Sequence, residues 1–415
     1  MRHVHHSGCV DKLVIRCDIL IQDGQTLSRN QDIIVENGTV IDIVPSGSLR
    51  TIDAHFAIIT PVFHNSHSHV EYHLLHGVDM GRPFFEWVRN VVQSKSTFPE
   101  DRWPLSSLLG ATALINMGYR STEDCSDSGC GAVALNAVGL HGRAYVEVNG
   151  LHPEQDILRA HNRITAALQQ EREGITVGVA PHALYSTSSL IFKLISDDYS
   201  KIPTCIHVDE SDAEFEFTHF GRGEFKEMYE RRHIEMNAPY SSSLRYLANE
   251  GFVNAQTTLI HGCTWDDEDI GIVRECGARW IVCPESNYNL QCKMPQVSKL
   301  RHSGIRIGIG TDSSLSCKNL SPFSQMQRLL DTPGDDIAAD AAFVFQAATL
   351  DQNGVSNRVC IGGSADLIGL PRQSTVSIGE ANIEQCIYYA SFFSSYYVMR
   401  GGLPTFLPSD CGGIL

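Results

Sequence analysis

The chain has 415 residues, a formal net charge of −16, 42% hydrophobic residues and 19% charged residues. These values are ordinary for a globular protein, and the length accommodates a barrel of about 250 residues plus a smaller domain. The acidic balance argues against nucleic acid as a partner, because phosphate binding requires a basic surface. It also disfavours an anionic membrane surface.

Cysteine usage and the N-terminal sequence predict a cytoplasmic protein. The 13 cysteines include no Cys-x-x-Cys pair, and several lie in apolar runs, namely Cys205, Cys263 and Cys283. This distribution is typical of reduced thiols rather than of a disulfide framework. The first residues lack the apolar stretch of a signal sequence, and no apolar segment approaches the roughly 20 residues that span a bilayer.

The first part of the chain predicts a small antiparallel sheet. Short β-type runs cover residues 13–21, 32–35 and 39–44, and Asn37-Gly38 between the last two favours a hairpin. The tail after residue 360 contains Ala365-Asp366-Leu367-Ile368 and an aromatic run over 388–397. We predict that both tail segments form strands that return to the N-terminal sheet.

From residue 57 onward, strand-like and helix-like segments alternate, which indicates repeated βα units. Helix-like stretches cover 105–117, 155–170, 241–250 and 267–276. There are eight strand candidates: 57–62, 120–125, 143–149, 175–180, 203–208, 257–262, 279–283 and 305–310. Eight is the number that a closed barrel requires. The expected fold is α/β, a (β/α)8 TIM-type barrel over 57–360 with a small β-sandwich domain built from 1–56 and 361–415.

Histidine and acidic side chains stand at the C-terminal ends of five of these strands. In chain order they are His67 and His69, His182, His207 with Glu210, His261, and Asp312. Parallel barrel strands end on one face, so these residues are expected to meet there. Three imidazoles and one carboxylate, from His67, His69, His207 and Asp312, suit one divalent metal ion, zinc or ferrous iron, with a position open for water. The pattern predicts metal-assisted hydrolysis.

Six segments resemble the cytosine-deaminase-like and chlorohydrolase-like branch of the amidohydrolase superfamily. They are Pro61–His69, Ala180–Ser186, His207–Ser211, Leu259–Gly262, Cys283–Asn287 and Gly310–Ser313, in the family's order and spacing. The resemblance implies that Asp312 accepts a proton from the metal-activated water. It implies that Glu210 carries a proton to the substrate ring and the leaving amine, and that His261 orients or polarises the water.

The resemblance also suggests a substrate. Thr97–Arg102 is similar to the segment that binds ribose hydroxyls in adenosine-type deaminases, so Glu100 is the candidate there, with His182 on the purine or sugar edge. Residues 84–89 and 210–225 resemble aminodeoxyfutalosine deaminases, which convert 6-amino-6-deoxyfutalosine to futalosine and ammonia in an alternative menaquinone route. Trp87 and Arg222 are the further candidates, Arg222 for the benzoate of that substrate.

Departures from the family pattern leave alternatives open. Val62 stands where the family has glycine, Leu184 where it has proline, and Glu285 where it has arginine. The alternatives are a deaminase of adenosine, methylthioadenosine or S-adenosylhomocysteine, a guanine- or triazine-type hydrolase, and a barrel that has lost catalysis. A small-molecule nucleoside is the expected partner, with no nucleic acid and no membrane. The aromatic run over 388–397 is also compatible with a homodimer interface.

Overall fold

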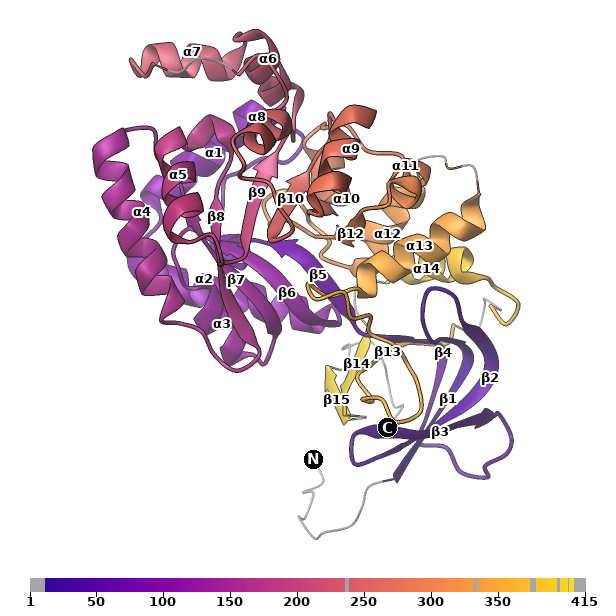
Figure 1. The fold of residues 1–415 in the computed structure, drawn as a ribbon. Helices are drawn as coiled ribbons and strands as arrows, with labels where there is room; N and C mark the ends of the chain where they lie inside the picture. Colours follow the sequence, from indigo (N-terminus) through magenta and orange to yellow (C-terminus); the bar gives the residue numbers. More distant parts are fainter. Residues whose placement is uncertain are drawn as a thin grey trace.

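The computed structural model describes residues 12–235, 239–331, 334, 336–373, 378–393, 396–401 and 403–406. Two sheets organise them, one of eight strands and one of seven, and they occupy separate regions of the molecule (Figure 1). Within these ranges, no helix is long and apolar enough to cross a bilayer.

The eight-stranded sheet is parallel and its strands follow chain order. They are β5 (Phe63–Ser68), β6 (Tyr119–Ser126), β7 (His141–Val148), β8 (Ile175–Pro181), β9 (Thr204–Val208), β10 (Thr257–His261), β11 (Arg279–Val282) and β12 (Arg306–Ile309). The first and last strands meet where the backbone N–H groups of Thr311 and Asp312 both donate to the His67 carbonyl at 3.0 Å. The predicted (β/α)8 barrel is confirmed, as are seven of its eight predicted strands.

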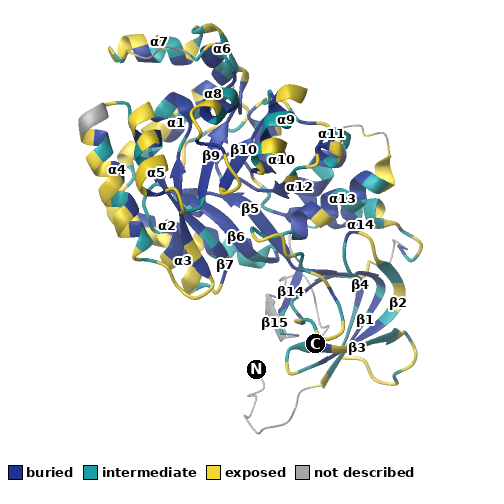
Figure 2. Cartoon of the chain, viewed as in Figure 1, coloured by how far each residue is buried: buried dark blue, intermediate teal, exposed yellow. Residues whose placement is uncertain are grey.

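Helices surround the barrel and bury its strands (Figures 1 and 2). They are α1 (Phe84–Thr97), α2 (Trp103–Asn116), α3 (Gly131–Ala137), α4 (Pro153–Leu168), α5 (Ser189–Asp198), α6 (Asp212–Phe220), α7 (Glu224–Arg231), α8 (Ser243–Asn249), α9 (Asp267–Cys276), α10 (Pro284–Asn289), α11 (Val297–His302), α12 (Pro322–Leu330) and α13 (Ile337–Thr349), with short 3-10 turns at Val70–Leu74, Glu100–Arg102 and Leu184–Ser186. Local chemistry sets their ends: α9 starts at a capping box of Asp266 and Asp269 and stops at Gly277, whose φ is 70°.

The seven-stranded sheet combines both ends of the chain, as predicted for the second domain. Its order is β15 (Leu403–Phe406), β14 (Tyr397–Arg400), β13 (Leu367–Leu370), β4 (Ala54–Pro61), β1 (Lys12–Ile21), β2 (Leu27–Glu36) and β3 (Thr39–Pro45). Asn37 and Gly38 turn the β2–β3 hairpin with φ values of 49° and 75°, the left-handed values that an Asn-Gly turn supplies.

Two sequence predictions are wrong. The strand predicted over 57–62 as the first of the barrel is β4, which pairs with β1 and β13 in the second sheet, and the barrel begins one residue after Pro61. Strands β4 and β5 are separated by one residue and an apolar run crosses from one to the other, so the composition does not show where the chain passes from one sheet to the other. The aromatic run over 388–397, predicted as strand, begins within helix α14 (Ile383–Ser391), which is started by a capping box at Asn382.

We propose the division into domains 1–56 with 361–415, and 57–360, with the first boundary falling inside β4. Helix α14 contacts the barrel helices α12 and α13, although its residues belong to the C-terminal segment.

Candidate metal centre

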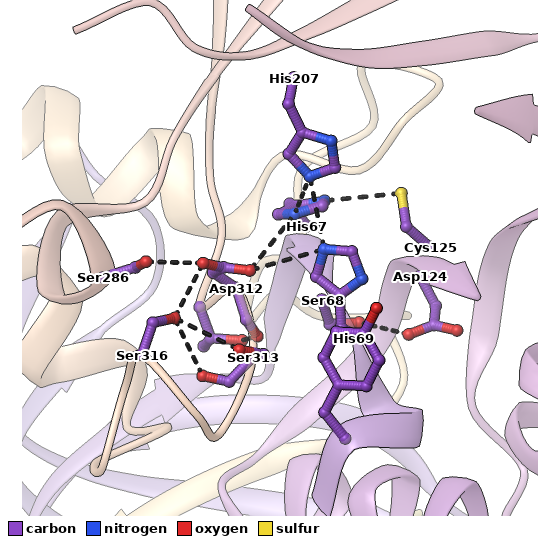
Figure 3. Close-up of polar contacts among 12 residues, drawn as sticks. His67, Ser68, His69, Asp124, Cys125, His207, Ser286, Asp312, Ser313 and Ser316 are labelled. Carbon is purple, nitrogen blue, oxygen red and sulfur yellow. Dashed lines mark hydrogen bonds and ion pairs between the residues drawn. The ribbon is translucent and has the colours of Figure 1, made fainter. Parts of the chain in front are cut away.

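Four side chains predicted as metal ligands converge at the C-terminal end of the barrel (Figure 3). His67 lies near the end of β5, His69 directly follows that strand, His207 lies in β9, and Asp312 follows β12. The Nε2 atom of His207 lies 3.3 Å from Nε2 of His67 and 3.4 Å from Nε2 of His69. The Oδ1 atom of Asp312 lies 3.7 Å and 3.6 Å from the same two nitrogens.

This donor set fits a divalent metal ion. Ligand bonds of about 2.0–2.1 Å in a tetrahedron place the donor atoms about 3.3 Å apart, which is the spacing seen among the imidazole nitrogens. All four side chains are buried. Burial lowers the pKa of His67 to about 4 and that of His69 to about 3, so both rings are neutral, the form that binds a metal.

Neighbouring groups hold the ligands in place. The His207 Nδ1 atom lies 2.9 Å from the backbone carbonyl of His182, which fixes Nε2 as the metal-facing nitrogen. The Oδ2 atom of Asp312 accepts hydrogen bonds from Ser286 Oγ at 2.6 Å and Ser316 Oγ at 2.8 Å, which leaves Oδ1 facing the histidines. Burial alone would raise the pKa of Asp312, but the hydrogen bond with His67 and the surrounding imidazoles hold it well below its usual value.

Backbone conformation also marks the site. Asp209, His261 and Asp312 have φ values of 50°, 76° and 59°, in the left-handed region that non-glycine residues seldom adopt. Asp209 is held there by its carboxylate, which accepts from the Ser243 backbone N–H at 2.9 Å and from Trp265 Nε1 at 2.8 Å. Such conformations cluster at functional sites, where the surrounding structure enforces them. Here, two of the three residues, His261 and Asp312, line the cavity described below.

Glu210 and His261 form a second group beside the ligands. Glu210 Oε1 lies 3.4 Å from His261 Nε2, and His261 Nδ1 lies 2.9 Å from Asn287 Oδ1. Burial, then the negative charges of Asp312 and Glu214, raise the pKa of Glu210 well above its ordinary value. A carboxyl group with a raised pKa can both donate and accept a proton near neutral pH.

The candidate metal-binding atoms open into a cavity of about 480 Å³. Its walls include the predicted residues Trp87 and His182, together with His69, His207, Glu210, His261 and Asp312. Aromatic rings form one side, from Phe84, Trp87, Tyr185 and Phe225. Trp87 Nε1 donates to the Leu315 carbonyl at 3.2 Å, so Trp87 offers the cavity an apolar ring face. Cavities of this size and lining suit small-molecule ligands.

The structure does not bring two of the predicted substrate-binding residues into this cavity. Glu100 is exposed at the start of a 3-10 turn and lines an adjoining cavity of about 540 Å³, which shares Val92, Lys95 and Asp127 with the first. The reason is its position before α2, where an acidic residue serves the helix N-terminus. Arg222 is exposed in the turn between α6 and α7 and pairs with Glu216.

Sequence reasoning missed several residues of the site. The cavity also contains the cationic side chains of Lys95, Arg159 and Arg232, none of which belongs to a recognised motif. Ser286 and Asn287, which contact Asp312 and His261, lie in the segment Cys283–Asn287 that resembles the family. The sequence could therefore have identified that pair, but not the three cations.

Comparisons with known proteins agree with this geometry. Residues 58–370 match the amidohydrolase family. The 5-methylthioadenosine/S-adenosylhomocysteine deaminase 2 of Archaeoglobus fulgidus is 29% identical over 280 residues, which are 66% of this chain and 63% of that protein. The aminodeoxyfutalosine deaminase of Deinococcus radiodurans is 25% identical over 329 residues, 74% of this chain and 78% of that protein.

Among solved structures, the aminofutalosine deaminase of Helicobacter pylori in complex with methylthio-coformycin superimposes with a TM-score of 0.76. The match covers 95% of this chain and 100% of that chain at 17% sequence identity, and it therefore shows a shared fold.

Proposed function

The chain belongs to the amidohydrolase family, and from that premise we propose that it is a metal-dependent enzyme that hydrolyses the amino group from a 6-aminopurine nucleoside. The observation that carries the proposal is the convergence of three imidazoles and one carboxylate beside the buried Glu210–His261 pair, all opening into one cavity. The deaminases of A. fulgidus and D. radiodurans support the reaction class by their similarity.

His67, His69, His207 and Asp312 would hold the ion, zinc by the preference of this donor set, with ferrous iron as the alternative. When bound, such an ion lowers the pKa of a water molecule toward about 7 and supplies a nucleophile at neutral pH.

The remaining steps belong to side chains of the site. Asp312 would accept the proton of the attacking water through Oδ1, because Oδ2 is occupied by two serine hydroxyls. Glu210 would donate its proton to the purine ring nitrogen, take up a second proton from the hydroxyl group added at C6 and pass it to the leaving amine, a role that its raised pKa supports. The proton held by Asp312 would then restore Glu210 to its starting state. His261, oriented by Asn287, would polarise the water.

For the substrate itself, we propose 6-amino-6-deoxyfutalosine, whose deamination yields futalosine and ammonia. Its benzoate requires a cation, and Arg232, Arg159 and Lys95 all line the cavity. Lys95 is paired with Asp127 at 2.6 Å and Arg159 with Asp156 at 2.9 Å. Arg232 has no ion pair with another described residue, which makes it the better benzoate partner than Arg222.

The second candidate is a deaminase of methylthioadenosine, S-adenosylhomocysteine or adenosine. This candidate is supported by the 29% identity to the A. fulgidus protein, which is named a deaminase of methylthioadenosine and S-adenosylhomocysteine. The two candidates share the purine chemistry and differ only in the group attached to the ribose 5′ carbon. The walls of the cavity away from the metal therefore decide between them.

Ammonia release from the zinc-loaded protein tests both candidates. We expect release from 6-amino-6-deoxyfutalosine with a kcat/KM well above those for adenosine, methylthioadenosine and S-adenosylhomocysteine. Equal values across the panel would refute the futalosine assignment, and no release from any member would refute nucleoside deamination.

A further inference from the structure

One buried carboxylate in the cavity wall has an oxygen atom without a hydrogen bond among the described residues. Glu147 is the seventh of eight residues in β7, is only 2% exposed, and lines the cavity that the metal ligands share. Its Oε2 atom makes no hydrogen bond within the described part of the chain. Burying a carboxylate oxygen without a hydrogen bond costs free energy, so this position indicates that a bound ligand supplies the missing hydrogen bond.

The strand alternation explains why Glu147 points inward. Its neighbours Val146 and Val148 pack in the large apolar cluster between strands and helices, whereas Tyr145 belongs to the cluster inside the barrel. Successive side chains of a strand face opposite sides, so Glu147 shares the inner side with Tyr145. At the C-terminal end of β7 this side opens into the cavity.

The neighbouring groups do not satisfy this carboxylate. Its Oε2 atom lies 4.0 Å from His69 Nδ1, which is too long for a hydrogen bond. Lys95, also in the cavity wall, is engaged elsewhere, with its Nζ atom 2.6 Å from Asp127 Oδ2 and 3.0 Å from the Tyr72 hydroxyl. Glu147 Oε2 is therefore a buried acceptor without a hydrogen bond, and it faces His69 Nδ1, which also lacks one among the described residues.

We propose that Glu147 accepts hydrogen bonds from the ribose hydroxyls of the nucleoside, an inference that rests on the proposed function. An ionised carboxylate only accepts hydrogen bonds. In a 6-aminopurine nucleoside the amino group is the one that reacts, and N1, N3 and N7 are acceptors. The sugar hydroxyls are the donors that remain. Glu147 takes the role that the sequence assigned to Glu100.

The test compares each enzyme on adenosine, 2′-deoxyadenosine and 3′-deoxyadenosine. Hydrogen bonds to a charged group of this kind correspond to roughly a 10- to 100-fold preference, so the wild type is expected to favour adenosine over at least one deoxynucleoside by that factor in kcat/KM. In Glu147→Gln, KM for adenosine rises and this preference shrinks to a few-fold. Because the preference is a ratio within one preparation, it is independent of the active fraction. Glu147→Asp, which keeps a carboxylate, provides a second variant that retains part of the preference.

Two controls separate the other readings. Glu227→Gln, at an exposed position of α7, is expected to leave the preference unchanged. A Glu147→Gln variant that keeps the wild-type preference but loses bound metal would show that Glu147 only orients His69 and would overturn the inference. If Glu100→Gln loses the preference for adenosine over the deoxynucleosides while Glu147→Gln keeps it, the assignment of the ribose contact to Glu147 is also refuted. A wild type that releases no ammonia from any nucleoside refutes the proposed function and this inference together, whereas an active wild type without any ribose preference refutes this inference alone.

Discussion

Replacement of Glu210 by glutamine is the perturbation that most sharply separates catalysis from folding. The side chain is buried, lies 3.4 Å from His261 Nε2 and carries no ion pair with a lysine or arginine among the described residues. Glutamine has nearly the same shape but cannot transfer a proton. General acid–base catalysis by one positioned group contributes about 10²- to 10⁴-fold, which is a barrier increase of about 3–5 kcal/mol when it is lost.

The same substitution removes a buried acid whose ionisation is opposed by burial and by the charge of Asp312. The free energy of unfolding of Glu210→Gln is therefore expected to equal or exceed that of the wild type near neutral pH. This combination, a large loss of kcat with no loss of stability, is the signature of a catalytic residue.

The assay is steady-state ammonia release by Glu210→Gln and by the control Glu227→Gln, with metal content measured on the same samples. We expect kcat of Glu210→Gln to fall at least 100-fold while its metal content stays at the wild-type level. A variant that keeps more than a tenth of the wild-type kcat would contradict the role of Glu210 as the proton carrier. Loss of activity accompanied by loss of metal would instead show that Glu210 is a ligand.

Three further predictions concern the ligands, pH and the substrate. Ser316→Ala removes a 2.8 Å hydrogen bond to Asp312 Oδ2 and is expected to weaken metal affinity about 10- to 100-fold, measured by competition with a chelator; unchanged affinity would contradict the proposed orientation of Asp312. Burial, and then the charge of Asp209, raise the pKa of Glu214 to about 8, so the folded state retains a proton that the unfolded state loses above about pH 4.5. The stabilisation from that proton is complete below about pH 4.5 and is lost as the pH rises through 8. In urea unfolding, the stability of Glu214→Gln relative to the wild type should therefore increase between about pH 5 and about pH 8.5. A stability difference that does not change with pH would refute the raised pKa. Arg232→Ala is expected to raise KM for 6-amino-6-deoxyfutalosine about 10-fold or more while leaving KM for adenosine unchanged. Arg222→Ala should change neither KM value. An equal rise in KM for both substrates in Arg232→Ala would refute the assignment of Arg232 to the benzoate.

The sequence predicted the barrel and the convergence of the candidate ligands because both follow from local pattern. Barrel strands β8 to β12 are short and largely apolar runs, and His207, His261 and Asp312 stand at or just after the end of such a run. Closure of a parallel barrel then brings these ends together, whatever their separation along the chain. His67 and His69 lie beside the other candidate ligands, although the strand predicted before them, 57–62, belongs to the seven-stranded sheet.

The residues that line the cavity away from the candidate metal site could not be predicted in the same way, because their positions depend on the paths of loops and on strand register. Glu100 and Arg222 were chosen by segment resemblance, and both lie outside the cavity because each sits in a turn at a helix end. Arg232 and Glu147 reach the cavity through the path of α7 and the register of β7. No motif in the sequence distinguishes Arg232 from the other arginines.

The most direct test of the central claim is the metal content of the purified protein by inductively coupled plasma mass spectrometry. We expect about one zinc or iron ion per chain in the wild type, and its loss in a His67→Ala/His69→Ala double variant whose circular dichroism spectrum is unchanged. A wild type that binds no divalent ion after exposure to zinc and iron, or a double variant that retains a full complement, would contradict the proposed metal centre and the chemistry derived from it.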